Sequence, residues 1–459
     1  VSGVIANLGF GPTLETAGPI QITAPTMTVN SGAIETQISG QGRASYIILQ
    51  VGNLNVNGNS RIDSSTVGPG RGGDIRVTSD SVSISGTGSG LFSDAQPSAT
   101  GRGGDIQVQT HQVELSNGAT ISSQTMGSGD AGNILVKADT FSLNGGATIT
   151  AQSIGSGAAG SVTVEGHQSP AQSVLIDGFG SGIFTDTQGT GAGGNIFVNA
   201  NSVMLQNGGT LSAKTSGTEP TATGGTITIQ GSDVQFKTGA IVTAETSGAG
   251  QGGTIDVVAT DNLSLRDASS ISSNSNSLLD NAGSAGVIRL SAPVIDVQTA
   301  LVSASTIGPG NAGTIILEAN QINLGTSETG QLHEQGADIF TRTTGPGLAG
   351  DITLRGRGGA ESKADIVTIS GFSRILSESF FGESDVQGNA GNISIQTGKL
   401  TLSEHSRLST ASESSTGNAG DITIVASDEV SISSHGQLSS GAIEFASGNG
   451  GRIAVSAPS

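Results

Sequence analysis

The sequence has no cysteine, no tryptophan and a single tyrosine among its 459 residues. Without cysteine the chain can form no disulfide, no zinc–thiolate site and no cysteine nucleophile. Charged residues are also few, at 12%, and the 37 acidic residues outnumber the 18 basic ones, which gives a net charge of −19. Nucleic acids and anionic membranes bind basic patches, so we expect neither as a partner. Solubility of an exposed surface explains the acidic charge most simply, and weak cation binding is the alternative.

Long apolar runs are missing as well. A membrane-spanning helix needs about 20 consecutive apolar residues, and no such run occurs, so we expect no membrane span. No signal peptide opens the chain, so we expect any targeting segment to lie outside it. Apolar spacings of three and four residues, which indicate amphipathic helices, are not sustained anywhere. Glycine is abundant instead, with 73 residues, and the apolar content of 34% is low.

The chain contains a repeat that returns about every 30 residues, and residues 131–136 (Ala-Gly-Asn-Ile-Leu-Val) are a clear copy. We call the second residue of this motif, Gly132 here, the anchor. Ile or Val stands two residues after each anchor glycine and another aliphatic residue two further on, as in Ile134 and Val136. This alternation predicts a strand with one buried face. The anchors are Gly73, Gly104, Gly132, Gly160, Gly194, Gly225, Gly253, Gly286, Gly313, Gly350, Gly391, Gly420 and Gly451.

Each repeat contains two further strand signals. A second aliphatic pair follows about nine residues after the anchor, as in Phe141 and Leu143, and a third strand places a small residue before an aliphatic one, as in residues 147–149. Each repeat is therefore expected to form three short strands separated by turns, followed by a glycine-rich loop. The pattern reaches back to Gly18, and Ser45 replaces glycine in the next repeat. About 14 complete repeats of roughly 27–41 residues result.

Three such strands cannot bury their inner faces alone, but stacking on the next repeat buries them. We therefore predict an all-β fold, a right-handed parallel β-helix (a single-stranded solenoid), because right-handed crossovers are the rule between parallel strands. One continuous solenoid is expected over residues 1–459. Residues 1–17 would end a preceding coil, 18–450 would form fourteen complete coils and 451–459 would begin another. Such ragged ends would fit a chain cut from a longer solenoid, or copies that stack end to end.

Two positions of the repeat have an expected structural role. We expect the anchor glycine to supply a turn conformation that a Cβ atom would hinder. The residue after the anchor is short and polar in most repeats, as in Asp74, Asp105 and Asn133. Such side chains can bond nearby backbone amides in a turn, or form a ladder between stacked repeats. A column of metal-binding carboxylates is the alternative, although Ser, Thr and Val interrupt the acidic run; we expect no metal site.

Insertions are the places where repeat scaffolds often carry function. Three insertions stand out, at residues 165–173, 326–336 and 355–365. Paired aromatic residues in the loop at 379–383 would form an adhesive contact if exposed, or plug a wide turn if buried. The candidate interaction residues are His167, His333, Glu334, Arg355, Arg357, Phe380 and Phe381.

The sequence offers few groups of residues that could form a catalytic site. Parallel β-helices include polysaccharide lyases and hydrolases, whose sites need carboxylates or basic residues clustered on adjacent coils. Here the five histidines are scattered over distant repeats. Asp94 and Asp186 occupy equivalent places, but their repeats are three apart, which puts them ~14 Å from each other, too far for an acid/base pair. We expect the chain not to be an enzyme, and we assign no catalytic residue, no cofactor-binding residue and no cofactor.

Several motifs resemble a known family. Gly-Asn-Ala-Gly-Asn-Ile-Ser-Ile (388–395), Gly-Asn-Ala-Gly-Asp-Ile-Thr-Ile (417–424), Gly-Ser-Gly-Asp-Ala-Gly-Asn-Ile (127–134) and Ser-Asn-Gly-Ala-Thr-Ile-Ser-Ser (116–123) are similar to the repeat region of filamentous-haemagglutinin-like exoproteins, especially those of cyanobacteria. The resemblance covers nearly the whole chain. It implies a right-handed β-helix secreted by the two-partner route, in which an outer-membrane pore exports an unfolded chain. The family's N-terminal secretion domain with its Asn-Pro-Asn signatures is missing, so the chain would be the shaft.

We therefore expect a secreted, cell-surface structural and adhesive fibre that mediates adhesion, extracellular-matrix formation or biofilm growth. The expected partners are an outer-membrane export pore, cell-surface glycans or other cells, and further copies of the chain placed end to end. Two alternatives belong to other classes: a polysaccharide-degrading β-helix enzyme and a carbohydrate-binding module. Product release from acidic glycans would favour the first alternative, and binding on a glycan array would favour the second.

Overall fold

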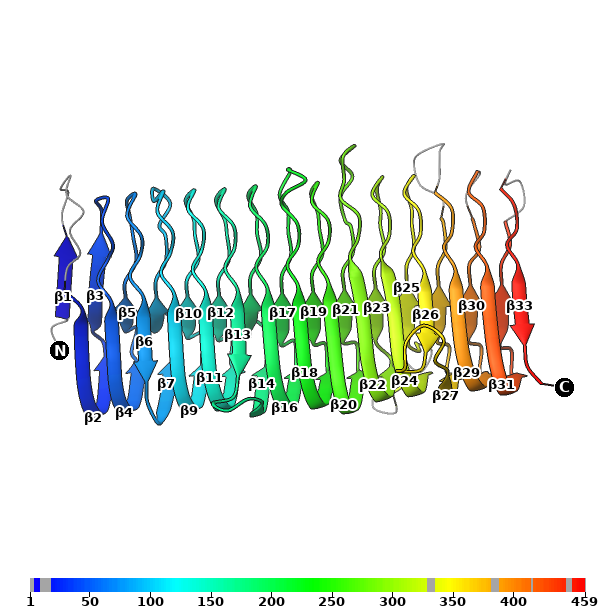
Figure 1. The fold of residues 1–459 in the computed structure, drawn as a ribbon, viewed down its shortest axis with the longest axis horizontal. Helices are drawn as coiled ribbons and strands as arrows, with labels where there is room; N and C mark the ends of the chain where they lie inside the picture. The colour runs from blue at the N-terminus through cyan, green and yellow to red at the C-terminus, as the bar shows by residue number, and fades with distance from the viewer. Residues whose placement is uncertain are drawn as a thin grey trace. The chain divides into compact units, whose positions relative to one another are not determined.

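The fold is all-β and consists of parallel strands stacked as a β-solenoid of about 14 coils, as the sequence predicts (Figure 1). The computed structural model describes residues 4–8, 18–327, 335–380, 388–413, 416–442 and 448–458, and every regular element within these ranges is a strand. The chain divides into two compact units, Val1–Gly231 and Ser232–Ser459, which are described separately. A right-handed sense of the coils and one continuous body over 1–459 stay predictions.

Unit 1 (Val1–Gly231) contains long strands that form two sides of each coil and short strands that form the third side. The long strands are β2 (Ile20–Asn30), β4 (Ile47–Asn57), β9 (Ile106–Ser116), β11 (Ile134–Asn144) and β16 (Ile196–Gln206), with β6 (Ile75–Thr78) and β7 (Ser81–Ser85), or β13 (Val162–Glu165) and β14 (Ala171–Asp177), replacing one long strand each. The short strands are β1 (Val4–Leu8), β3 (Ala33–Ile38), β5 (Arg61–Asp63), β8 (Gly90–Phe92), β10 (Thr120–Ser122), β12 (Thr148–Thr150), β15 (Gly182–Phe184) and β17 (Thr210–Ser212).

Unit 2 (Ser232–Ser459) has the same two kinds of strand, and β18 (Ile227–Lys237) runs through the division between the units. The long strands are β20 (Ile255–Arg266), β22 (Val287–Gln298), β24 (Thr314–Gly325), β29 (Ile393–Leu402) and β31 (Ile422–Ile432), with β26 (Ile352–Arg355) and β27 (Ala364–Ile369) forming one divided strand and β33 (Ile453–Ser456) a single first half. The short strands are β19 (Ile241–Thr243), β21 (Ser270–Ser272), β23 (Leu301–Ser303), β25 (Asp338–Phe340), β28 (Arg374–Leu376), β30 (Arg407–Ser409) and β32 (Gln437–Ser439).

Equivalent strands of neighbouring coils pair in parallel and in register. In unit 1, Ile134 of β11 pairs with Ile106 of β9 on one side and with Val162 of β13 on the other. The first and last strands expected from the sequence are confirmed, since β1 pairs with β3 and β33 pairs with β31. This register places the aliphatic side chains of successive coils directly over one another.

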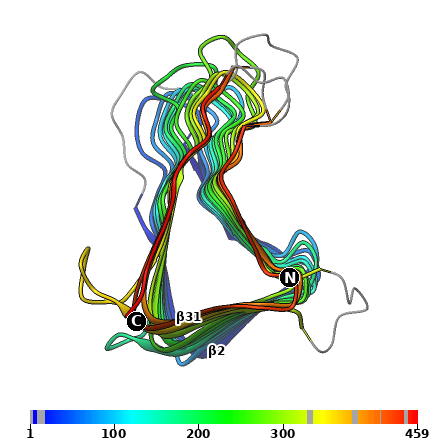
Figure 2. The ribbon, with the colours of Figure 1, turned by 90° about the vertical axis from the view of Figure 1, so that its right-hand side faces the viewer.

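The sequence predicts a turn between the first and second strands of each coil. This prediction is wrong for most coils. The two segments form one strand of 10–12 residues, such as β11. Ile134, Val136 and Ala138 of β11 are buried, but Asp139 and Thr140 are both half-exposed before Phe141 is buried again. Two successive outward residues shift the alternation and form a corner, which Figure 2 shows in the three-sided outline of the coils. The strand is divided where an insertion follows its first half, as between β13 and β14.

The core is the stack of inward-facing aliphatic residues. Ile134 is 1% exposed, and its partners Ile106 and Val162 are fully buried. Burial of each such side chain stabilises the fold by about 1.5–3 kcal/mol. Because every coil repeats the same positions, the apolar interior stays narrow and continuous within each unit.

The anchor glycines allow the backbones of neighbouring coils to come into close contact. The prediction that they supply a special turn conformation is wrong. Anchors such as Gly104 and Gly132 do not have a positive φ. A Cβ atom on Gly132 would lie only 2.0 Å from the carbonyl oxygen of Gly104 in the previous coil and 2.3 Å from Ser123 Oγ. The amide of Gly132 donates a hydrogen bond at 3.1 Å to the carbonyl of Ser123, which follows the third strand of the previous coil. This bond closes the coil into a neck, beyond which the glycine-rich loop projects (Figure 2).

Most of the left-handed backbone positions lie instead in the turn between the second and third strands. Both central residues of this turn have a positive φ in many coils, as at Asn117 (56°) and Gly118 (79°), or Gly145 (59°) and Gly146 (81°). Glycine and asparagine adopt this conformation at the lowest cost. The second position of this turn, two residues before the short strand, is Gly118 or Gly146 in these coils.

Candidate binding groove

The short polar residues after the anchors form ladders between coils. Asp105 Oδ1 accepts a hydrogen bond from the amide of Asn133 at 2.8 Å, and Asn133 Oδ1 accepts one from the amide of Ser161 at 2.9 Å. The expected bonding to backbone amides is confirmed, with the amide supplied by the next coil. Within the described ranges, no three histidine, aspartate or glutamate side chains are grouped so that they could hold a metal ion.

One sequence-predicted interaction residue, His167, lies in unit 1 in the loop between β13 and β14. Its ring stacks on that of His111 with centroids 5.4 Å apart, and its Nε2 is 3.0 Å from Gln109 Nε2. His111 Nδ1 lies 2.6 Å from an Asp139 carboxylate oxygen. This hydrogen bond and the charge of Asp139 raise the pKa of His111 above its usual value.

The other predicted interaction residues lie in unit 2 or outside the described ranges. Arg355 at the end of β26 binds Glu318, with Nη2 2.6 Å from Oε1, and Arg357 is exposed in the following loop. Phe380 is half-buried, so it is neither a fully exposed contact nor a buried plug, and the Arg342 guanidinium lies 5.0 Å from its ring centroid. His333, Glu334 and Phe381 fall outside the described residues. No common site contains the described candidates, and their role in binding stays a prediction.

The equivalent carboxylates Asp94 and Asp186 are three coils apart, as expected. Asp94 is 4% exposed and accepts hydrogen bonds from Ser122 Oγ at 2.5 Å and from the amide of Gln124 at 3.0 Å, both in the next coil. Burial raises the pKa of Asp94 to about 6, and these two hydrogen bonds oppose the rise. Asp94 is thus a polar link between coils.

Replacing Asp94 with asparagine is expected to remove a pH dependence of stability. The pKa of Asp94 rises from 3.8 to about 6 on folding, so the folded state binds more protons between these values. Stability therefore falls as the pH rises through this window, by about 3 kcal/mol in total. Asn274 shows that asparagine fits such a position, because its Oδ1 accepts from Ser303 Oγ and the amide of Ser305, both at 2.7 Å.

The measurement is the free energy of unfolding of both proteins by urea at a series of pH values from 4 to 7. Asp94→Asn should match the parent near pH 4 and exceed it by up to about 3 kcal/mol at pH 7. Asp186→Asn is the matched control, because Asp186 accepts the same two bonds from Ser212 Oγ and the amide of Lys214. A stability difference between Asp94→Asn and the parent that does not vary with pH would contradict the assignment.

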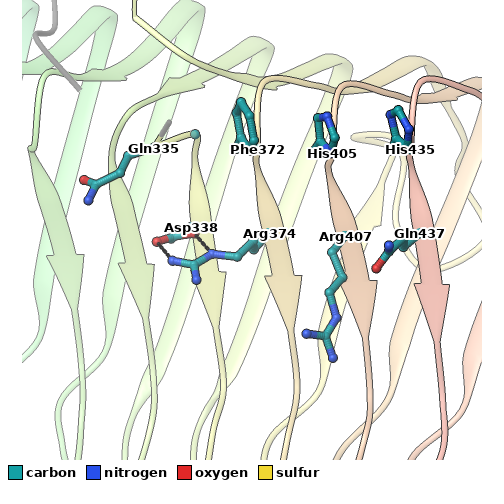
Figure 3. Close-up of a pocket in the computed structure, with 9 residues that line it drawn as sticks. Gln335, Asp338, Phe372, Arg374, His405, Arg407, His435 and Gln437 are labelled. Carbon is teal, nitrogen blue, oxygen red and sulfur yellow. Dashed lines mark hydrogen bonds and ion pairs between the residues drawn. The ribbon is translucent and has the colours of Figure 1, made fainter. Parts of the chain in front are cut away.

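A groove of about 360 Å³ runs across successive coils of unit 2 (Figure 3). It lies over the short strands β25, β28, β30 and β32 and the turns that precede them. None of its residues was among the candidates named from the sequence. The lining residues are Gln335, Gly336, Asp338, Phe372, Arg374, His405, Arg407, His435 and Gln437.

One edge of the groove is a row of three stacked rings, Phe372, His405 and His435, which we call the ring row (Figure 3). The centroids of Phe372 and His405 are 5.1 Å apart, and those of His405 and His435 are 4.5 Å apart, with the planes within 6° of parallel. The three residues have φ values of 61°, 61° and 67°. They therefore hold the left-handed turn position that Gly118 and Gly146 hold in unit 1. A side chain there costs about 1–2 kcal/mol, which ring stacking offsets only in part.

The floor of the groove is a row of polar side chains at the first position of each short strand. Asp338, Arg374, Arg407 and Gln437 pair in register across four neighbouring coils. Arg374 donates two hydrogen bonds to Asp338, from Nε to Oδ1 at 2.7 Å and from Nη2 to Oδ2 at 2.6 Å. Among the described residues, Arg407 binds only through Nη2, which donates to Glu378 Oε1 and to Ser409 Oγ, both at 3.0 Å. The Nε and Nη1 groups of Arg407 are left for another acceptor.

The groove is locally cationic in an acidic chain. Glu378, only 1% exposed, lies between Arg342 and Arg407 at 3.5 and 3.0 Å. Burial raises the pKa of Glu378, and the two arginines oppose the rise. Among the lining residues, the guanidinium groups of Arg374 and Arg407 face one carboxylate, that of Asp338, which is bound to Arg374. The balance is one net positive charge, against −19 for the whole chain.

The sequence contains a signal for this groove that our reading of the repeat overlooked. Phe372-Ser373-Arg374 and His405-Ser406-Arg407 place a ring two residues before an arginine in consecutive repeats, and His435-Gly436-Gln437 follows the same spacing. Most other repeats carry glycine or asparagine at the ring position. The departure from glycine at a turn was therefore the informative feature.

Comparison with protein-family models, curated proteins and solved structures finds no match for this chain. The fold alone therefore defines its class, a parallel β-solenoid protein. No helix with the length and apolar character needed to cross a membrane occurs in the part of the chain that the structure describes.

Proposed function

We propose that this protein is a secreted, cell-surface structural fibre that adheres to glycans or to other cells. The observation that carries the proposal is the continuous bonding from coil to coil. In unit 2, Asp351 Oδ1 accepts the amide of Asn392 at 2.8 Å, and Asn392 Oδ1 accepts the amide of Asp421 at 2.9 Å, beside the backbone ladders of the sheets. Repeats bonded in this way stabilise one another through their neighbours, which suits a load-resistant scaffold.

The export route is part of the proposal. The resemblance of the repeats to filamentous-haemagglutinin-like exoproteins supports secretion through an outer-membrane pore that passes an unfolded chain. A chain without cysteine suits such a route, because no disulfide can form before export. The pore would be the export partner, and the folded coils outside the cell would form the fibre shaft.

Gene deletion tests the proposal directly. Cells that lack the protein are expected to attach less to surfaces and to one another, and immunogold labelling of parent cells is expected to place the protein outside the outer membrane. Deleting the export pore should move the label inside the cell. Unchanged attachment together with intracellular label in parent cells would contradict the proposal.

A polysaccharide-degrading enzyme is the competing class. Incubation of the purified chain with a panel of acidic glycans should release neither reducing ends nor unsaturated products if the fibre proposal is right. Release above that of a heat-denatured control would favour the enzyme.

A further inference from the structure

We infer that the groove of unit 2 binds a linear polysaccharide carrying carboxylate groups, which lies across the coils between the ring row and the arginines. The inference rests on the proposed adhesive function and names the chemistry of its partner. Three observations support it: the donors left on Arg407, the strained position of the rings and the repetition of both groups from coil to coil.

The arginines supply the site for a carboxylate. A planar guanidinium matches a carboxylate with two parallel hydrogen bonds, and Arg374 and Asp338 already adopt this geometry inside the groove. Arg407 has its Nε and Nη1 groups unused and its side chain 34% exposed. Because Nη2 is already bound, a uronate carboxylate can add one charge-assisted hydrogen bond at Nε or at Nη1 of Arg407 without displacing Glu378 from Nη2.

The ring row supplies contacts for sugar hydroxyl groups. Because the three rings stack on one another, their edges line the groove, and ring edges carry partial positive charge that attracts oxygen atoms. The imidazole N–H groups of His405 and His435 can also donate hydrogen bonds. All three residues are exposed, and they hold a backbone conformation that glycine adopts more easily. Local strain that is kept in three consecutive coils supports a functional role for these rings.

The repetition favours a linear polymer. Arg374 and Arg407, like Phe372, His405 and His435, stand at the same positions of consecutive coils, so the same contacts recur at steps of ~4.8 Å. A ligand that itself repeats along its length can make these contacts several times. Polysaccharide chains with a carboxylate on each sugar have this character.

The first experiment compares three probes on the purified full chain by calorimetry. They are a hexamer of galacturonate, the hexamer of galactose with the same linkage, and a polyglutamate peptide of the same charge. We expect the uronate to bind at least about tenfold more tightly than the neutral sugar, because its carboxylates gain charged hydrogen bonds. Polyglutamate should bind no better than the neutral sugar. Equal binding of the neutral sugar, or tighter binding of polyglutamate, would overturn the inference; the second result would indicate an acidic peptide ligand.

Two variants test the assigned residues. Each introduces a residue that another coil of the protein already carries at the equivalent position. Arg407→Gln copies Gln437 of the next coil, and His405→Gly copies Gly146 of unit 1. Each is expected to weaken uronate binding about tenfold or more while the circular-dichroism spectrum stays unchanged. A double variant with Glu378→Gln guards against an unpaired buried carboxylate in the Arg407 variant.

The matched control is Arg61→Gln in unit 1. Arg61 begins the short strand β5 as Arg407 begins β30, but Asn59 and Gly88 stand at the turn position where the groove has rings. Uronate affinity should not change in this variant. Full affinity in folded Arg407→Gln and His405→Gly proteins, or an equal loss in Arg61→Gln, would overturn the inference.

The failure of this inference can be told apart from failure of the fibre proposal. Cells carrying Arg407→Gln should display the protein normally and lose attachment only to uronate-coated surfaces. Normal attachment to those surfaces would overturn the groove assignment and leave the fibre proposal standing. If cells carrying Arg407→Gln do not display the protein, display of Arg61→Gln on matched cells shows whether arginine replacement in general prevents export.

Discussion

Replacing Ile134 with aspartate is expected to destabilise the fold by at least about 5 kcal/mol at pH 7. Ile134 is 1% exposed and stacks between Ile106 and Val162, so the new carboxylate would be surrounded by aliphatic side chains of three coils. The loss combines the missing apolar burial with the desolvation of a charge. Because coils stabilise their neighbours, we expect the coils on both sides to unfold together with the mutated one.

The measurement is urea unfolding followed by circular dichroism, with hydrogen exchange locating the coils that open. Leu135→Asp is the matched control, because Leu135 is the adjacent residue but faces outward and is half-buried; its effect should stay within about 1 kcal/mol. The difference between the two variants should shrink at low pH, where the buried carboxylate is neutral. Equal effects of the two substitutions at pH 7 would contradict the inward orientation of Ile134.

Replacing Gly132 with alanine is expected to cost about 3 kcal/mol, although alanine is usually the better residue for stability. The added Cβ would lie 2.0 Å from the Gly104 carbonyl oxygen and 2.3 Å from Ser123 Oγ. The in-register ladder holds Gly104 in place, so the overlap can be relieved only by opening the neck of the coil. Loss of the Gly132 to Ser123 backbone hydrogen bond should follow.

Gly18→Ala provides the control for this substitution. Gly18 is the first anchor, and a Cβ atom there would meet nothing within 4 Å. This variant should be neutral or stabilised by up to about 1 kcal/mol, because alanine lowers the entropy of the unfolded chain. Thermal unfolding of both variants under one buffer gives the comparison. A Gly132→Ala protein as stable as Gly18→Ala would show that the neck tolerates a side chain.

The fold could be predicted from the sequence because its information is repeated. The alternation at Ile134 and Val136 recurs after every anchor glycine, so chance agreement at one copy does not matter. The corner at Asp139 and Thr140 was harder to foresee. Two successive polar residues usually indicate a turn, but here they bend a continuous strand because the ladder to the next coil persists through the corner.

The role of the anchor glycine was misjudged for a related reason. Its environment consists of Gly104, the anchor of the previous coil, and Ser123, which follows the third strand of that coil, and neither is adjacent to Gly132 in sequence. The sequence around a glycine indicates its backbone dihedral angles φ and ψ. At Gly132 the constraint is instead the close contact with the backbone of Gly104 in the neighbouring coil. Ser45 shows that one anchor position accepts a residue with a side chain.

The groove escaped prediction because its residues come from four repeats. The insertions supply His167 and Arg355, which bind locally to Gln109 and Glu318 and do not reach the groove. The groove instead uses ordinary positions of the repeat with unusual occupants. Aligning the repeats by their third strands would have shown His405 and His435 in a column otherwise rich in glycine.

The strict register between coils has an evolutionary consequence. Excision of residues 132–159 would join Ala131 to Gly160 and leave Ile106 opposite Val162, two residues that already share one partner in Ile134. Misaligned recombination between copies of the gene segment can thus shorten or lengthen unit 1 by whole coils without disturbing the interior. Selection can therefore change the length of such a molecule in steps of one coil, while point mutations at the outward-facing positions change its surface.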